Sequence, residues 1–135
     1  SDFSDTPYAV LAALREADIA SEKGDNEAAF VALDWSYQHA GIDALKAVAG
    51  ISLARVQIAR SKAQEALDLV DKLPKGGFDS TSAELRGDAL AALGRKDDAR
   101  AAYTDALTHL EQGAPNRAFV EMKLNDLGGA EKKGS

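Results

Sequence analysis

Residues 84–106 read ELRGDALAALGRKDDARAAYTDA, and the spacing of small and apolar residues within this stretch decides the fold. A glycine, an alanine and a large apolar residue follow one another at fixed steps, as Gly94, Ala99 and Tyr103. Two looser copies lie upstream: Gly24, Ala29 and Leu33, then Ser61, Ala66 and Val70. The alanines of the three copies are 37 and 33 residues apart. Periods of this length are typical of stacked helical hairpins, which usually present a binding surface and carry out no chemistry.

Glycine, proline and polar capping residues divide the rest of the chain into predicted helices. We expect helices over 7–23 (with Thr6 as N-cap), 27–39, 44–60 (with Asp43 as N-cap), 63–72, from Ser80 or Ser82 to Leu93, 97–112 and 116–127. The predicted fold class is all-α, a helical-hairpin solenoid of about three repeats plus a C-terminal capping helix. This domain covers 6–127, between a lead over 1–5 and a disordered tail over 128–135 that has few apolar residues.

Composition excludes several functional classes. The net charge of −6, with both signs interspersed, argues against nucleic acid, which calls for a basic stripe. The chain has no cysteine, and His39 and His109 show no metal-ligand spacing. No serine stands in a nucleophile motif and no glycine-rich phosphate loop occurs. We therefore expect no enzyme, no metal site and no cofactor.

A known repeat family shares the spacing of the third copy. Gly87, Leu90, Gly94, Ala99, Tyr103 and Ala106 resemble the tetratricopeptide pattern, although Ala83 stands where that pattern has a tryptophan. In this pattern Gly87 and Ala99 let two helices approach, and Tyr103 fills the space between neighbours. Longer strings, LARVQ at 53–57, ELRGDAL at 84–90, GRKDDAR at 94–100 and MKLNDL at 122–127, resemble the C-terminal part of the YfgM family, the ancillary subunits of the bacterial Sec translocon.

This resemblance implies a location and a set of partners. It implies a tetratricopeptide-like domain on the periplasmic face of the inner membrane, tethered by one N-terminal span that was removed from this chain, which starts with Ser1. It implies association with the SecYEG channel and a PpiD-like periplasmic chaperone, and a role in passing newly secreted client proteins to chaperones. The alternative is a repeat scaffold that holds an envelope assembly together without handling clients.

Candidate binding residues follow from the repeat register. Arg55 and Asp88 occupy equivalent positions on first helices of successive repeats, which face the concave groove. They either bind a partner or form an ion pair between repeats, Arg55 with Asp88 or with Glu84. Val48, Ile51 and Ile58 share the predicted helix 44–60 with Arg55 and form either an apolar strip in the groove or part of the core.

Trp35 is the only tryptophan, and it lies opposite the apolar stripe of the helix 27–39. It either packs on an N-terminal segment or anchors an interface, since tryptophan is a frequent hot spot. The first hairpin has no predicted helix before Pro7, so we expect a possible homodimer through residues 7–35.

Overall fold

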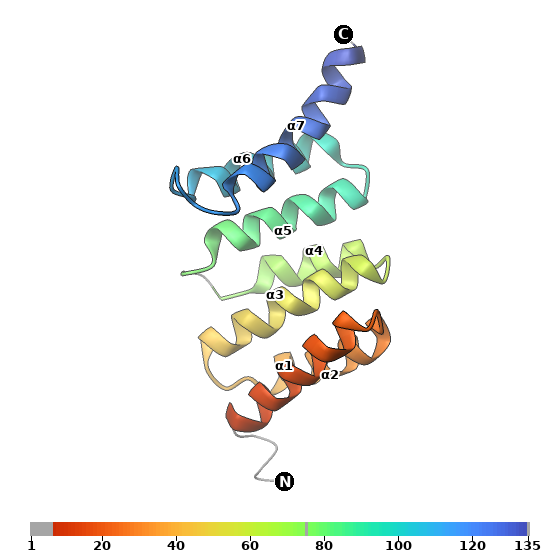
Figure 1. The fold of residues 1–135 in the computed structure, drawn as a ribbon, viewed down its shortest axis with the longest axis vertical. Coiled ribbons are helices and arrows are strands. Elements are labelled where there is room, and N and C mark those ends of the chain that lie inside the picture. The colour runs from red at the N-terminus through yellow and green to blue at the C-terminus, as the bar shows by residue number, and fades with distance from the viewer. Residues whose placement is uncertain (1–6, 75, 135) are drawn as a thin grey trace. The chain divides into compact units, whose positions relative to one another are not determined.

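The fold consists of α-helices joined by short turns, in a computed structural model that describes residues 7–74 and 76–134 (Figure 1). The helices of this part of the chain are α1 (Pro7–Glu22), α2 (Asn26–His39), α3 (Asp43–Ala59), α4 (Ala63–Lys72), α5 (Asp79–Ala92), α6 (Lys96–Thr108) and α7 (Arg117–Gly134). These residues form no strand, which confirms the all-α hairpin array. In the described residues, no helix combines the length and the apolar character that a membrane crossing requires.

The first four helices match their predicted bounds to within one residue, but the last two do not. The helix α6 ends at Thr108 instead of 112, because the N–H groups of His109 and Leu110 bond to carbonyls three residues back and tighten the chain into a turn. The helix α7 continues to Gly134, whereas a disordered tail was predicted from 128 onward. Alanine, glutamate and lysine at 130–133 have high intrinsic helix propensity.

Two predicted helix caps are wrong. The helix α5 begins at Asp79 after Phe78, so Ser80 and Ser82 both lie inside it, and the Ser80 hydroxyl donates to the Ala106 carbonyl of α6 at 3.2 Å. Asp43 is the first residue of α3 and not its cap. A true cap is Asp25, whose carboxylate accepts a 3.0 Å hydrogen bond from the Ala28 N–H at the start of α2. Thr6 lies outside the described residues.

The two helices of each hairpin are joined by one turn, and the turns of the three hairpins have the same hydrogen bonds. In each, one N–H bonds to a carbonyl three residues back and the next to a carbonyl five residues back, as for Gly24 with Ser21 and Asp25 with Ala20, at 3.0 and 2.8 Å. The residue at the centre is left-handed, with φ of 77° at Gly24 and 79° at Gly94. Ser61 has φ of 65° in the equivalent turn, so a serine takes a conformation that favours glycine.

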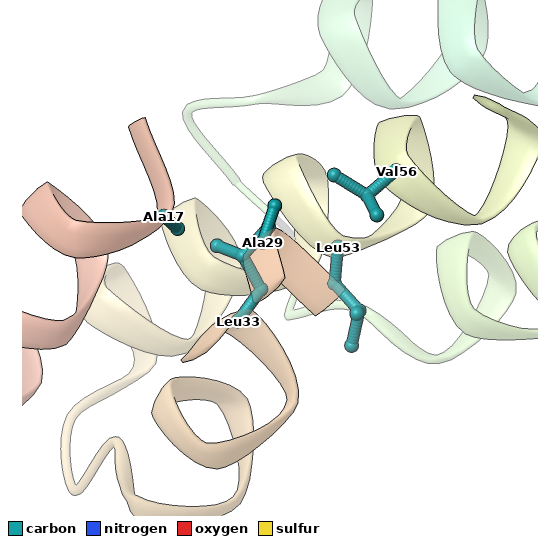
Figure 2. Close-up of a cluster of buried hydrophobic side chains, with 5 residues drawn as sticks. All are labelled: Ala17, Ala29, Leu33, Leu53 and Val56. Atoms are coloured by element: carbon teal, nitrogen blue, oxygen red, sulfur yellow. The ribbon is translucent and has the colours of Figure 1, made fainter. Parts of the chain in front are cut away.

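The chain divides into two compact units, residues 1–74 and 75–135. In the first unit, α1 packs on α2, α2 on α3 and α3 on α4. Its core joins residues of α1, α2 and α3, as Figure 2 shows: Ala17, Ala29, Leu33, Leu53 and Val56. Ala17 and Ala29 are two of the five residues of this cluster, and such small side chains let neighbouring helices approach closely.

In the second unit, α5 packs on α6 and α6 on α7. The ring of Tyr103 covers Gly87 so closely that a Cβ atom there would lie 2.5 Å from the ring carbon Cε1. Tyr103 is only 3% exposed, and Ala99 is fully buried beside it in the same hairpin. The structure therefore confirms that Gly87 lets the two helices approach, with Tyr103 filling the space against it.

Candidate protein-interaction site

Arg55 lies beside an open hollow of about 340 Å³ within the first unit. The floor of the hollow is formed by core residues, among them Leu33 and Val56, and the rim is polar. The rim residues come from α1, α2 and α3: Asp18, Ser21, Asn26, Ser52 and Arg55. An apolar floor surrounded by hydrogen-bonding groups is the arrangement that holds a side chain and fixes the backbone beside it.

The Arg55 guanidinium is exposed and forms no hydrogen bond or ion pair with the described residues of its own unit. Arg60, at the end of α3, differs in this respect. Its Nε bonds to Glu27 at 2.8 Å and its Nη1 to Gln57 at 2.7 Å, and its guanidinium lies 4.0 Å from the Phe30 ring centroid. Arg60 thus fastens α2 to α3, whereas Arg55 has no comparable contact within the described residues of its unit.

The three apolar candidates on α3 differ in exposure. Val48 is 39% exposed, Ile58 is half-buried, and Ile51 is only 6% exposed. Ile51 therefore lies in the core, because α3 packs against both α2 and α4. This agrees with the alternative prediction, in which the strip belongs to the core. Val48 and Ile58 keep accessible surface, and an apolar strip formed by them beside Arg55 stays a prediction.

Trp35 is half-buried and lies at a different hollow from Arg55. Its indole stacks on the His39 ring, with 4.3 Å between ring centroids, and the carbonyl of Trp35 lies 2.9 Å from His39 Nδ1. With Val31 and small residues of α1 and α2, it lines a second open hollow of about 450 Å³. The tryptophan is accessible at this hollow, whose lining differs from that of the hollow beside Arg55.

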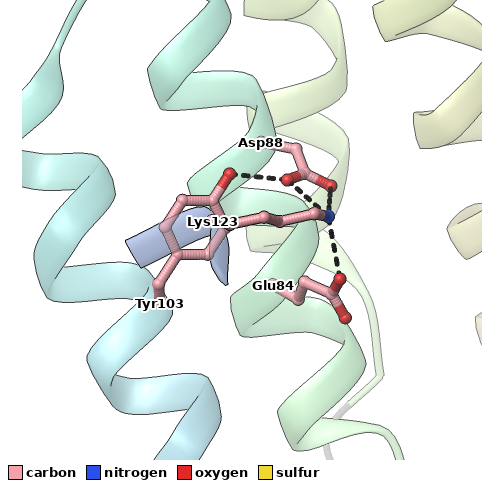
Figure 3. A network of polar contacts seen from close by, with 4 residues as sticks. All are labelled: Glu84, Asp88, Tyr103 and Lys123. Atoms are coloured by element: carbon pink, nitrogen blue, oxygen red, sulfur yellow. Dashed lines mark hydrogen bonds and ion pairs between the residues drawn. The ribbon is translucent and has the colours of Figure 1, made fainter. Parts of the chain in front are cut away.

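Asp88 is held in a polar network that ties together the three helices of the second unit (Figure 3). The Tyr103 hydroxyl donates to Asp88 Oδ1 at 2.6 Å. Lys123 of α7 donates to the same oxygen at 2.9 Å and to Glu84 Oε2 at 2.8 Å. The carboxylates of Glu84 and Asp88 are thus occupied inside their unit, which indicates a structural role for Asp88. An ion pair of Arg55 with either of them would join the two units and stays a prediction.

The network shifts the pKa of two of its members. Burial raises the pKa of the Tyr103 hydroxyl well above its ordinary value, and the hydrogen bond to Asp88 raises it further. Burial alone would lower the pKa of Lys123, but its hydrogen bonds to Glu84 and Asp88 outweigh this effect and the pKa rises. Lys123 therefore stays charged and Tyr103 stays neutral at physiological pH.

Sequence reasoning did not place Asp18 at the hollow or Lys123 in the network. Asp18 could have been found from the repeat register, because it precedes Arg55 by 37 residues, the step between the first two repeats. Lys123 belongs to a capping helix outside the repeat pattern, so no equivalent position points to it.

Comparison with known proteins agrees with this architecture. Three proteins named ancillary SecYEG translocon subunit are each 32% identical to the chain: from Escherichia coli K12 over 89% of the chain, from Aggregatibacter actinomycetemcomitans over 90%, and from Haemophilus influenzae over 92%. They bear out the resemblance to the YfgM family. The chain spans 58% to 60% of the length of these relatives. Residues 1–129 match the tetratricopeptide repeat-like domain family, and the chain therefore belongs to that family.

Proposed function

We propose that this chain is a non-catalytic protein-interaction domain of a protein associated with the Sec translocon at the inner membrane, and that it helps to pass newly secreted proteins to periplasmic chaperones. The observation that supports this function is the similarity along about nine-tenths of the chain to three ancillary SecYEG translocon subunits. The partners are then SecYEG, a PpiD-like chaperone and secreted clients, and the domain lies on the periplasmic side.

The hollow beside Arg55 suits a segment that has not yet folded. Such a segment exposes apolar side chains and unpaired backbone carbonyls. The floor at Leu33 and Val56 offers an apolar surface, while Arg55, Asn26 and the serine hydroxyls offer donors to the carbonyls. Because the hollow is open and shallow, contacts of this kind favour weak and reversible binding, as a transfer step needs.

The test is suppression of aggregation of a chemically unfolded secretory protein by the purified chain. We expect the wild-type chain to slow aggregation and Arg55→Glu to lose most of this effect, since the reversal replaces donors by a carboxylate. Lys96→Glu, an exposed charge reversal on α6, is the matched control and should act as wild type. No suppression by the wild-type chain, together with a stoichiometric folded partner on purification, would instead support an assembly scaffold without client handling.

Attachment to the translocon is tested separately. Affinity purification of the natural-length protein from detergent-solubilised inner membranes should recover SecYEG and a PpiD-like chaperone. Purification of the protein without either partner would contradict the proposed location.

A further inference from the structure

The helix α1 carries an exposed stripe along the side that does not face the core. The outer stripe consists of exposed residues on one face of α1: Tyr8, Leu11, Arg15, Asp18, Ile19 and Glu22. Its apolar members are 69%, 53% and 45% exposed for Tyr8, Leu11 and Ile19, whereas Val10 and Ala17 on the core side are buried. Large apolar side chains that stay exposed together on one helix face are typical of interaction sites on soluble proteins.

The stripe also forms a surface depression. A hollow of about 640 Å³ is lined by Leu11, Leu14, Arg15, Asp18, Ile19 and Glu22, all from α1. An occupant of this hollow therefore meets one helix along about three turns. A second helix laid along α1 fits this shape, because helices pack through side chains at these same spacings.

The charges at the middle of the stripe are self-complementary. Arg15 and Asp18 are exposed, carry opposite signs and form no ion pair among the residues that the structure describes. A two-fold axis between Glu16 and Ala17 would place an antiparallel copy of α1 with its Asp18 level with Arg15 and its Ile19 level with Leu14. A parallel copy in register would place Arg15 against Arg15 and Asp18 against Asp18, which is repulsive.

We propose that a second copy of this chain covers the outer stripe, with the two α1 helices antiparallel and with two reciprocal Arg15–Asp18 ion pairs around the two-fold axis. A symmetric dimer requires a surface that is complementary to itself, and a charge pair of opposite sign with Leu14 and Ile19 beside it provides this. The inference is independent of the proposed function, since it concerns the chain without any other partner.

The first experiment is sedimentation velocity of the purified chain between about 1 and 200 µM, a range that detects micromolar association. We expect a monomer–dimer equilibrium that weakens at high salt. Arg15→Asp and Asp18→Arg should each weaken the dimer by about tenfold or more, because symmetry makes each substitution break two ion pairs. The combined exchange, Arg15→Asp with Asp18→Arg, should restore the dimer to within about threefold of wild type.

Lys96→Asp is the matched control for charge reversal and should leave dimerisation unchanged. Circular dichroism of each variant verifies that the helices are intact. A chain that stays monomeric throughout the range, as it would if a different protein covers the stripe, overturns the proposal. A dimer that tolerates Arg15→Asp and Asp18→Arg overturns it as well.

A second experiment uses the absence of cysteine from the chain. A mixture of the Arg15→Cys and Asp18→Cys proteins, oxidised together, should give mainly the mixed disulfide between the two variants. Each variant oxidised alone should cross-link far less. Equal cross-linking of Arg15→Cys with itself would indicate the parallel arrangement and contradict the proposal.

Discussion

Replacing Gly87 by alanine probes the closest approach between helices in the second unit. The new Cβ atom would lie 2.5, 2.6 and 2.9 Å from three carbons of the Tyr103 ring. Carbon atoms in contact are about 3.5–4.0 Å apart, so the ring must retreat by about 1 Å. It has little room to do so, because it is buried and its hydroxyl is bound to Asp88 at 2.6 Å.

The magnitude follows from opposing effects. Overpacking of a buried site costs about 1–3 kcal/mol, and weakening the hydrogen bond to the ionised Asp88 costs about 1 kcal/mol more. Alanine gains about 1 kcal/mol over glycine in helix propensity. We therefore expect Gly87→Ala to lower the free energy of unfolding by about 1–3 kcal/mol.

The first repeat suggests the control. There Ala17 and Leu33 stand at the positions of Gly87 and Tyr103, and both are buried in the same core cluster. In a Tyr103→Leu background, Gly87→Ala should therefore be neutral or stabilising by up to about 1 kcal/mol. Urea unfolding followed by circular dichroism measures the free energy of unfolding of the wild type, the two single variants and the double variant. An equal effect of Gly87→Ala in both backgrounds would refute the close-packing explanation.

Three other expectations concern separate features. Ser61→Gly should raise the free energy of unfolding by about 0.5–1 kcal/mol, because it relieves a left-handed serine with φ of 65°. Thermal melts measure this change, and Ser61→Ala should not raise the free energy of unfolding in the same melts. In the folded state the pKa of Tyr103 and that of Lys123 are both raised above their ordinary values of 10.0 and 10.5. The stability that the network contributes is therefore complete below pH 10 and is lost as the pH rises above 10. Unfolding curves between pH 8 and 12 should show this decline in stability, and Tyr103→Phe should make the decline smaller. Ile51→Glu should unfold the first unit, since it places a charge at a site only 6% exposed. Val48→Glu should change the free energy of unfolding by less than about 0.5 kcal/mol. Circular dichroism distinguishes the two variants, and a well-folded Ile51→Glu protein would contradict the assignment of Ile51 to the core.

The features that local sequence determines were predictable. The turn residues Gly24, Ser61 and Gly94 recur at the repeat period, and all three adopt the same hydrogen-bonded turn. The pairing of Gly87 with Tyr103 was also predictable, because the two residues belong to one hairpin whose register is fixed by that turn.

Features that depend on distant parts of the chain were not predictable. Lys123 binds Asp88 and Glu84, which precede it by 35 and 39 positions in the sequence, and charge pattern alone does not reveal that pairing. Ile51 looked equally suited to a groove and to a core, because α3 is apolar on nearly all sides and only its packing against α2 and α4 shows which side is covered.

The most direct test of the proposed function is site-specific photo-cross-linking in cells that express the protein at its natural length. A photo-reactive residue in place of Ser52, on the rim of the hollow beside Arg55, reports what the hollow contacts during protein export. The same residue in place of Thr104, exposed on α6, is the control. We expect adducts with newly exported chains or translocon subunits at Ser52 and few at Thr104. Adducts that are absent at Ser52, or equally abundant at both positions, would contradict the assignment of the hollow as the binding site.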